Sequence, residues 1–248
     1  MAGTDVVTVF VAALLTALAT GLGALPLLSR RLGGHGALGV ANAAASGVML
    51  GASLSLVLEG GDRSVWRTAA GVLAGVAFIL VASRFFHAPH RDLTLGSLRG
   101  DDAIKALLIV AVMTVHSVAE GVGVGAAFGG GETLGLLVAI AIAVHNIPEG
   151  LAISLVLVPR GASVPAAAGW SVFSSLPQPL LAVPAFLFVD AFEGILPAAL
   201  GFAAGAMVWM VARELLPEAL EQASRRAVAV TAGVAFAAML AFQTILLY

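Results

Sequence analysis

The sequence contains no cysteine and very few charged residues. Only 10% of its 248 residues are Asp, Glu, Lys or Arg, whereas soluble domains typically carry about 25%. So few charges cannot solvate the surface of a chain of this length. Because 60% of the residues are hydrophobic and the mean hydropathy is +1.05, lipid is the expected solvent. The net charge of −2, without a basic patch, argues against a nucleic-acid partner.

The absence of cysteine excludes disulfides and thiolate metal ligands. Any metal ion would have to be held by His, carboxylate, amide or thioether groups. The first apolar stretch, Val6 to Leu28, follows no basic segment and is too long for a signal-peptide core. We expect it to be a mature membrane helix.

The apolar runs predict an all-α, polytopic membrane protein with eight transmembrane helices in a tight bundle. A membrane span needs roughly 20 apolar residues, and eight runs come near this length between short polar or Gly/Pro-rich breaks. No soluble domain is left over, so residues 1–248 are expected to form a single transmembrane domain. The runs are residues 4–28, 36–59, 66–86, 103–128, 133–157, 165–189, 194–220 and 227–248.

Lys and Arg are unevenly divided between the two sides. The loops after the odd-numbered spans, with their helix-end flanks, hold most of them, and positively charged loops favour the cytoplasm. We therefore expect both termini outside, in a plasma or inner cell membrane. The cytoplasmic set is Arg30, Arg31, Arg84, Arg91, Arg99, Lys105, Arg160, Arg225 and Arg226, and the opposite set is Arg63 and Arg67.

A faint internal repeat relates the second span to the seventh. Leu38 to Met49 resembles Leu196 to Met207, and the two spans run in opposite directions. Inverted repeats are typical of transporters, where they place a site at the bilayer midplane. Coincidence in an Ala/Gly-rich chain explains the likeness as well.

The chemistry is concentrated in two motifs. The fourth span contains His116 and Glu120, and the fifth contains His145 and Glu149. In each pair the residues are four apart, so they share one helical face. Each His lies near the middle of its span, and a short Gly-rich loop joins the two helices. Two imidazoles and two carboxylates are therefore expected to converge at one depth.

Energetics favours a functional reading of these residues. An ionised carboxylate at the bilayer centre costs at least about 2.5–3.5 kcal/mol on insertion scales. A divalent cation between Glu120 and Glu149 would cancel both charges, and neutral imidazoles suit a borderline metal such as zinc. The alternative is two His–Glu pairs that only hold the bundle together. Intramembrane ionisable residues are functional by default, and here four coincide.

These motifs resemble the ZIP (Zrt/Irt-like) divalent metal transporters, particularly prokaryotic members. His116-x-x-x-Glu120-Gly121 and His145-x-x-Pro148-Glu149-Gly150 carry the resemblance. The further likenesses are Ser46–Gly47–Val48–Met49, Pro177-Gln178-Pro179 and Glu214-Leu215-Leu216-Pro217-Glu218-Ala219.

The resemblance implies import of zinc, or of iron, manganese or cadmium, into the cytoplasm by alternating access. It also implies an inverted repeat of helices 1–3 and 6–8 around helices 4 and 5. It places the primary site at the four His and Glu residues, with Met49 as a further contributor. No organic cofactor is implied, and the oligomeric state stays open, with a homodimer as one candidate.

The chain departs from the family at a second, adjacent metal site that many members have. The residues at those positions are the neutral Ser117, Asn146 and Gln178. Glu120 and Glu149 offset one divalent ion, whereas a second ion would bring two uncompensated charges into a low-dielectric site. We expect one metal ion, with the neutral residues also acting as polar contacts between helices.

Two weaker candidates lie towards the cytoplasmic side. Glu214 and Glu218 could form an exit relay, or could be a surface ion pair and a solvated helix end. His87 and His90 in the long loop are too few for a tight site, so a solvated loop is favoured.

Two other functions compete with transport. An intramembrane metal-dependent hydrolase would use a bound metal to activate water, but the H-E-x-x-H motif is absent and no nucleophile stands beside a base. A non-transporting helical scaffold is the third reading.

Overall fold

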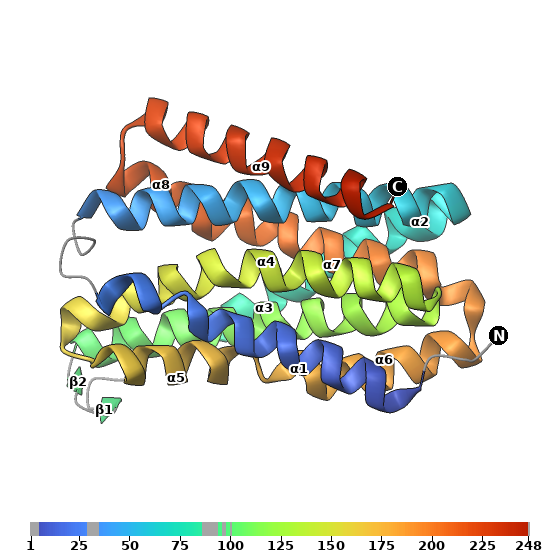
Figure 1. Cartoon of the computed structure of the whole chain (residues 1–248), viewed down its shortest axis with the longest axis horizontal. Coiled ribbons are helices and arrows are strands. Elements are labelled where there is room, and N and C mark those ends of the chain that lie inside the picture. The colour runs from blue at the N-terminus through green and yellow to red at the C-terminus, as the bar shows by residue number, and fades with distance from the viewer. Residues whose placement is uncertain (1–4, 29–34, 86–93, 96–97, 100, 248) are drawn as a thin grey trace.

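The computed structural model describes residues 5–28, 35–85, 94–95, 98–99 and 101–247 of the chain. Its long helices run side by side along one axis (Figure 1), and a short antiparallel pair of strands lies at one end. The elements are α1 (Val6–Leu22), η1 (Leu25–Leu28), α2 (His35–Phe85), β1 (Thr94–Leu95), β2 (Leu98–Arg99), α3 (Asp101–Gly129), α4 (Glu132–Leu157), η3 (Val158–Arg160), α5 (Val164–Ser175), α6 (Pro177–Ala191), η4 (Glu193–Ile195), α7 (Leu196–Met210), η5 (Val211–Leu215), α8 (Leu216–Gln222) and α9 (Arg225–Leu247).

The predicted all-helical, polytopic membrane architecture is confirmed. Within the described residues, seven helical segments are long and apolar enough to cross a membrane. This count is one lower than the eight runs of the sequence, because the run 36–59 and the described part of the run 66–86 both fall within α2. The candidate span in α2 has 47 residues, and at 1.5 Å per residue a straight helix of this length would be about 70 Å long. That is more than twice the thickness of the hydrocarbon core of a bilayer.

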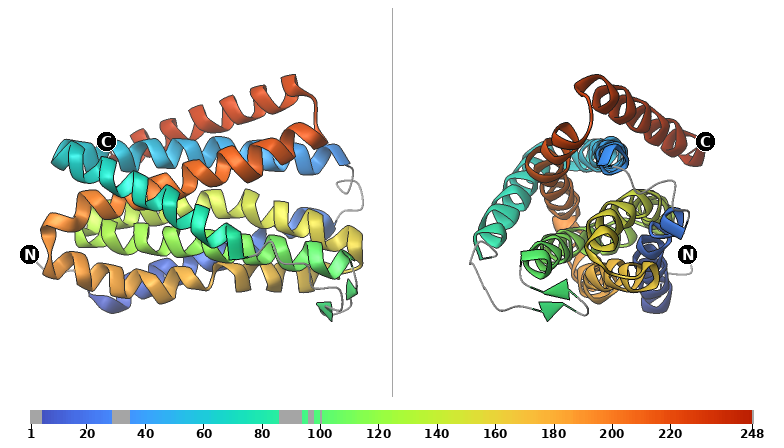
Figure 2. Two further views of the ribbon diagram at one scale, coloured as in Figure 1. Left: turned by 180° about the vertical axis from the view of Figure 1, so that it is seen from behind. Right: turned by 90° about the vertical axis from the view of Figure 1, so that its left-hand side faces the viewer.

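α2 is not straight, because Ser64 has non-helical backbone angles (φ −165°, ψ 103°). Before Ser64, Gly39 lies against Ala223 and Gly60 against Pro197, so this limb runs antiparallel to α7 and α8. After Ser64, Gly71 lies against Ala198 and Gly75 against Phe202, so the second limb runs parallel to α7. The chain therefore reverses direction at Ser64, as the ribbon shows (Figure 2).

Local signals explain where several helices begin. Asp5 caps α1 by accepting a hydrogen bond from the Thr8 amide at 2.6 Å, and Ser163 caps α5. Between α3 and α4, Gly131 adopts φ +129°, a conformation that residues with a side chain rarely adopt. The tight connection makes α3 and α4 antiparallel neighbours, as expected for two spans joined by a short Gly-rich loop.

Two predicted spans are interrupted. The run 165–189 is divided into α5 and α6, because Pro177 has no backbone N–H to continue the ladder of α5. The run 194–220 contains η4, α7, the π-helical segment η5 and α8. A π segment is a one-residue expansion of a helical turn, and residue spacing alone does not reveal it.

A stripe of glycines brings α3 close to α6. A Cβ atom at Gly121 would meet the backbone of Gln178, and one at Gly125 would overlap the carbonyl oxygen of Ala182. Gly129 continues the stripe against Val189. Small residues four apart permit this close approach of membrane helices. The register of α3 against α6 is therefore fixed from the residue next to Glu120 onwards.

α1 and α4 approach each other in the same way. A Cβ at Gly150 would overlap the carbonyl oxygen of Thr20, and one at Gly23 would overlap the backbone of Ile147 and Leu151. Both contacts keep the two backbones in direct contact beside Glu149. α1 thus forms one wall of the space into which α4 directs its polar side chains.

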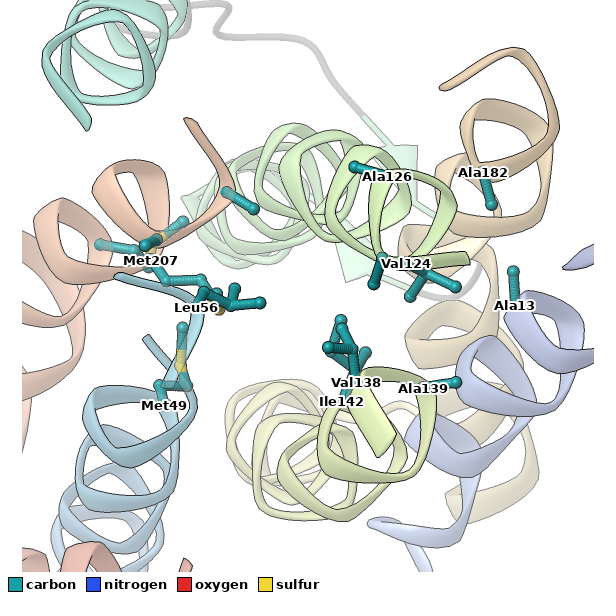
Figure 3. Close-up of a cluster of buried hydrophobic side chains, with 14 of the residues drawn as sticks. Ala13, Met49, Leu56, Val124, Ala126, Val138, Ala139, Ile142, Ala182 and Met207 are labelled. Atoms are coloured by element: carbon teal, nitrogen blue, oxygen red, sulfur yellow. The ribbon is translucent and has the colours of Figure 1, made fainter. Parts of the chain in front are cut away.

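A large apolar cluster fills the centre of the bundle. Met49 and Leu56 of α2 gather with Met207 of α7, and Val138 and Ile142 of α4 lie across from them (Figure 3). All five side chains are buried. The cluster joins α2 and α7 to the helices that carry the polar site.

Replacing Gly125 by Ala is expected to lower the melting temperature of the detergent-solubilised protein. The new methyl group would overlap backbone that cannot move aside easily, and overpacking of this kind typically costs about 1–3 kcal/mol. Gly169→Ala is the matched control, because Gly169 is exposed on α5 and a Cβ there would meet nothing within 4 Å. Equal melting temperatures for the two variants would contradict the close α3–α6 approach.

Candidate metal centre

The structure brings the four predicted His and Glu residues together. Each offers one ligand atom, and these atoms all lie within 4.8 Å of one another. All four side chains are fully buried. They come from the middle of α3 and the middle of α4. We call His116, Glu120, His145 and Glu149 the His/Glu cluster.

Glu120 is the most heavily bonded member of the cluster. Its Oε1 atom lies 3.1 Å from Nε2 of His116 and in short contact with Nε2 of His145. Its Oε2 atom accepts a hydrogen bond of 2.5 Å from the side-chain amide of Gln178. Oε2 therefore faces an amide donor and Oε1 faces two imidazole nitrogens, of which Nε2 of His145 donates to it in the tautomer that carries hydrogen on that atom. Such contacts stabilise a negative charge in this dry environment.

Glu149 has the opposite environment. Neither of its carboxylate oxygens has a hydrogen-bond partner among the residues that the structure describes, although the side chain is fully buried. Nδ1 of His116 and Nδ1 of His145 likewise have no partner in the described part of the chain. Buried polar atoms are almost always satisfied. A cation between Glu149 and the imidazoles would satisfy the carboxylate.

The positions of the expected second site form a chain of amides beside Glu120. Asn146 donates through Nδ2 to Oε1 of Gln178 at 3.2 Å and to the backbone oxygen of Thr16 at 2.8 Å. Gln178 in turn donates to Glu120. Ser117 is buried, and its hydroxyl has no hydrogen-bond partner within the described residues. Asn146 and Gln178 thus act as polar contacts between α1, α4, α6 and α3.

Met49 and the weaker candidates lie apart from these hydrogen bonds. Met49 is buried in the apolar cluster of Figure 3, and its participation in metal binding stays a prediction. Glu214 of η5 and Glu218 of α8 line a cavity of about 320 Å³ together with Arg160. The neighbour Arg213 lies over the ring of Trp209, 5.9 Å from its centroid. His87 and His90 lie outside the described residues.

Two threonines of α1 belong to this region and were not predicted. Thr16 donates its hydroxyl to Oε1 of Gln178 at 2.5 Å, and Thr20 shares a hydrogen bond of 2.8 Å with Ser175. Both are buried. Their spacing of four residues in a largely apolar span was a usable signal, because it places two polar groups on one helical face.

Comparison with known proteins places the chain in a family. The sequence model of the ZIP zinc transporters matches residues 87–241, which include the whole His/Glu cluster. The chain belongs to this family. A protein of Arabidopsis thaliana named "Putative zinc transporter" is 47% identical over 245 residues, which cover 97% of this chain and 39% of that protein.

The comparisons bear on two of the predictions made from the sequence. ZIP proteins are transporters, which goes against the intramembrane hydrolase. The relative is a plant protein, so the comparison gives no support to a likeness to prokaryotic ZIP members in particular. The chain spans about two fifths of the length of that relative.

Proposed function

We propose that this ZIP-family chain carries a divalent metal ion, zinc foremost, across the membrane through the His/Glu cluster. The observation that carries the proposal is the buried carboxylate of Glu149, whose two oxygens have no hydrogen-bond partner among the described residues. One of its oxygens lies within 4.8 Å of a ligand atom from each of the other three members of the cluster. Zinc is four-coordinate with nitrogen and oxygen ligands in many proteins. One imidazole nitrogen or carboxylate oxygen from each member of the cluster supplies this number, with Met49 as an added thioether ligand.

Charge balance supports a single ion. Glu120 and Glu149 together match one divalent cation, and the adjacent positions contribute neutral groups. Gln178 already donates to Glu120 at 2.5 Å, so its NH₂ group occupies the side of the carboxylate that a second ion would face. Iron(II), manganese and cadmium also accept imidazole and carboxylate ligands, and they belong to the proposed substrate range.

The proposed transport path crosses a bundle of eight spans with both termini outside. Its support is the reversal of α2 at Ser64, together with the beginning of α1 and the end of α9, which lie at one end of the bundle (Figure 1). Import by alternating access would deliver the ion towards the cavity of Glu214 and Glu218. The inverted repeat of helices 1–3 and 6–8, the single-domain organisation, the cell-membrane location and a homodimer stay predictions.

Glu149→Gln is expected to reduce zinc uptake into vesicles that contain the purified protein by at least tenfold. The change keeps the shape of the side chain but removes one of the two charges that match the ion. Loss of an outer-shell partner alone typically costs about 10–100-fold in metal affinity. His145→Ala should have an effect at least as large.

Glu132→Gln is the matched control, because Glu132 is an exposed residue in the first turn of the same helix. It should transport as the wild type does. Wild-type uptake by well-inserted Glu149→Gln protein would show that the cluster is not the transport site.

The double variant Asn146→Asp, Gln178→Glu is expected to bind two zinc ions, whereas the wild type binds one. The variant places two more carboxylates beside Glu120, and a second cation would then be compensated. Without metal it should be less stable than the wild type, since four carboxylates crowd a low-dielectric space. Metal analysis after equilibrium dialysis gives the number of ions per chain.

Asn146→Asp alone serves as the comparison for the double variant, because it adds only one charge. Two ions between α3, α4 and α6 of the unmodified protein, seen by anomalous scattering, would contradict the charge-balance argument.

A further inference from the structure

Thr16 of α1 occupies a position that the proposed transport function does not yet use. Its side chain is buried, and its hydroxyl lies 2.5 Å from Oε1 of Gln178 and 2.6 Å from the backbone oxygen of Ala13. A hydroxyl has one hydrogen to donate. The two acceptors lie almost equally near, so the hydrogen is shared between them, as in other three-centre hydrogen bonds. Removal of the hydroxyl would therefore remove the contact of α1 with the Gln178 amide oxygen.

The amide of Gln178 has two possible orientations, and its neighbours select one. Oε1 faces two donors, the hydroxyl of Thr16 and the amide of Asn146. Nε2 faces an acceptor, Oε2 of Glu120, at 2.5 Å. If the amide were reversed, its oxygen would face the carboxylate of Glu120 and its NH₂ group would face the NH₂ group of Asn146. Both of these contacts would be repulsive, whereas a hydroxyl can donate or accept. Glu120 and Asn146 therefore select the orientation, and the hydroxyl of Thr16 holds Oε1 in place.

The orientation of Gln178 decides how Glu120 meets an ion. With the NH₂ group on Oε2, Glu120 presents only Oε1 to the two imidazoles and the space beside them. One oxygen per carboxylate suits the tetrahedral coordination that zinc prefers. A carboxylate with both oxygens available suits ions of higher coordination number, such as manganese with six oxygen-rich ligands.

We propose that Thr16 is a positioning residue of the metal site, which fixes the Gln178 amide and so makes Glu120 a one-oxygen ligand that favours zinc. The proposal rests on the proposed function, because it assigns the ion to the His/Glu cluster. It adds α1 to the helices that determine selectivity, although α1 contributes no metal ligand. Outer-shell partners of this kind orient the ligand and tune the metal preference.

The test compares Thr16→Val with Thr20→Val in zinc and manganese binding to the purified protein. Valine keeps the shape of threonine and removes the hydroxyl. Thr20 is the matched control, since it is equally buried, lies one turn further along α1 and bonds to Ser175 rather than to Gln178. Both variants lose one interhelical hydrogen bond, so a merely structural effect would appear in both.

Thr16→Val should weaken zinc binding about tenfold, the lower end for loss of an outer-shell partner, and should lower the ratio of zinc to manganese affinity. Thr20→Val should leave both affinities unchanged, and Thr16→Ser, which keeps the hydroxyl, should restore zinc binding. Thr16→Val added to Gln178→Leu should cost nothing further, because the two residues act through one contact. Equal losses in Thr16→Val and Thr20→Val, or an unchanged affinity ratio, would overturn the proposal.

A second readout needs no metal. The chain contains three glutamines, at positions 178, 222 and 243, so ¹⁵N-glutamine labelling gives three side-chain amide signals, and Gln178→Leu identifies one of them. Thr16→Val should shift this signal and Thr20→Val should not. An unshifted signal in Thr16→Val would overturn the role of Thr16. Wild-type protein that binds no zinc would instead overturn the proposed function, and the amide spectrum would still decide whether Thr16 orients Gln178.

Discussion

The arrangement of the bundle depends on the cost of burying two carboxylates in an apolar interior. Glu120 meets part of this cost through an amide hydrogen bond and short contacts with two imidazole nitrogens, whereas Glu149 has no such partner among the described residues. One carboxylate is thus held in place by the protein, while both oxygens of the other are left for a cation. The groups around the two carboxylates come from α1, α3, α4 and α6, so these four helices must meet at one depth. The glycine contacts between α3 and α6 and between α1 and α4 allow this close approach.

The candidate site could be predicted from the sequence because it depends on local spacing. His and Glu four residues apart share a helical face in any regular helix, and the Gly-rich link between residues 129 and 131 makes the two helices antiparallel. The membrane character followed from composition alone. Neither the site nor the membrane character requires knowledge of which helices, distant in the sequence, are in contact.

Other features were predicted only in part or not at all, because they depend on contacts between distant segments. The reversal of α2 at Ser64 falls between the predicted spans 36–59 and 66–86, but the sequence did not show that helix continues on both sides up to this one residue. The division of α5 from α6 was visible only as Pro177, which membrane helices often tolerate. Thr16 looked like an ordinary polar residue in the first span, and its meeting with Gln178 joins residues 162 positions apart.

The π-helical turn of η5 has a consequence for insertions and deletions. It contains one residue more than a regular turn needs, and it separates the face of α7 that carries Gly201 and Gly205 from the face of α8 that carries Glu218. Because the wider π turn absorbs this extra residue, loss of one residue between Val211 and Leu215 would restore a regular helix without rotating α8 relative to α7. Glu218 would still face its cavity. The same deletion in a regular turn of α7 would instead rotate everything after it by about 100°, so this one turn is the place where the helix tolerates a change of length.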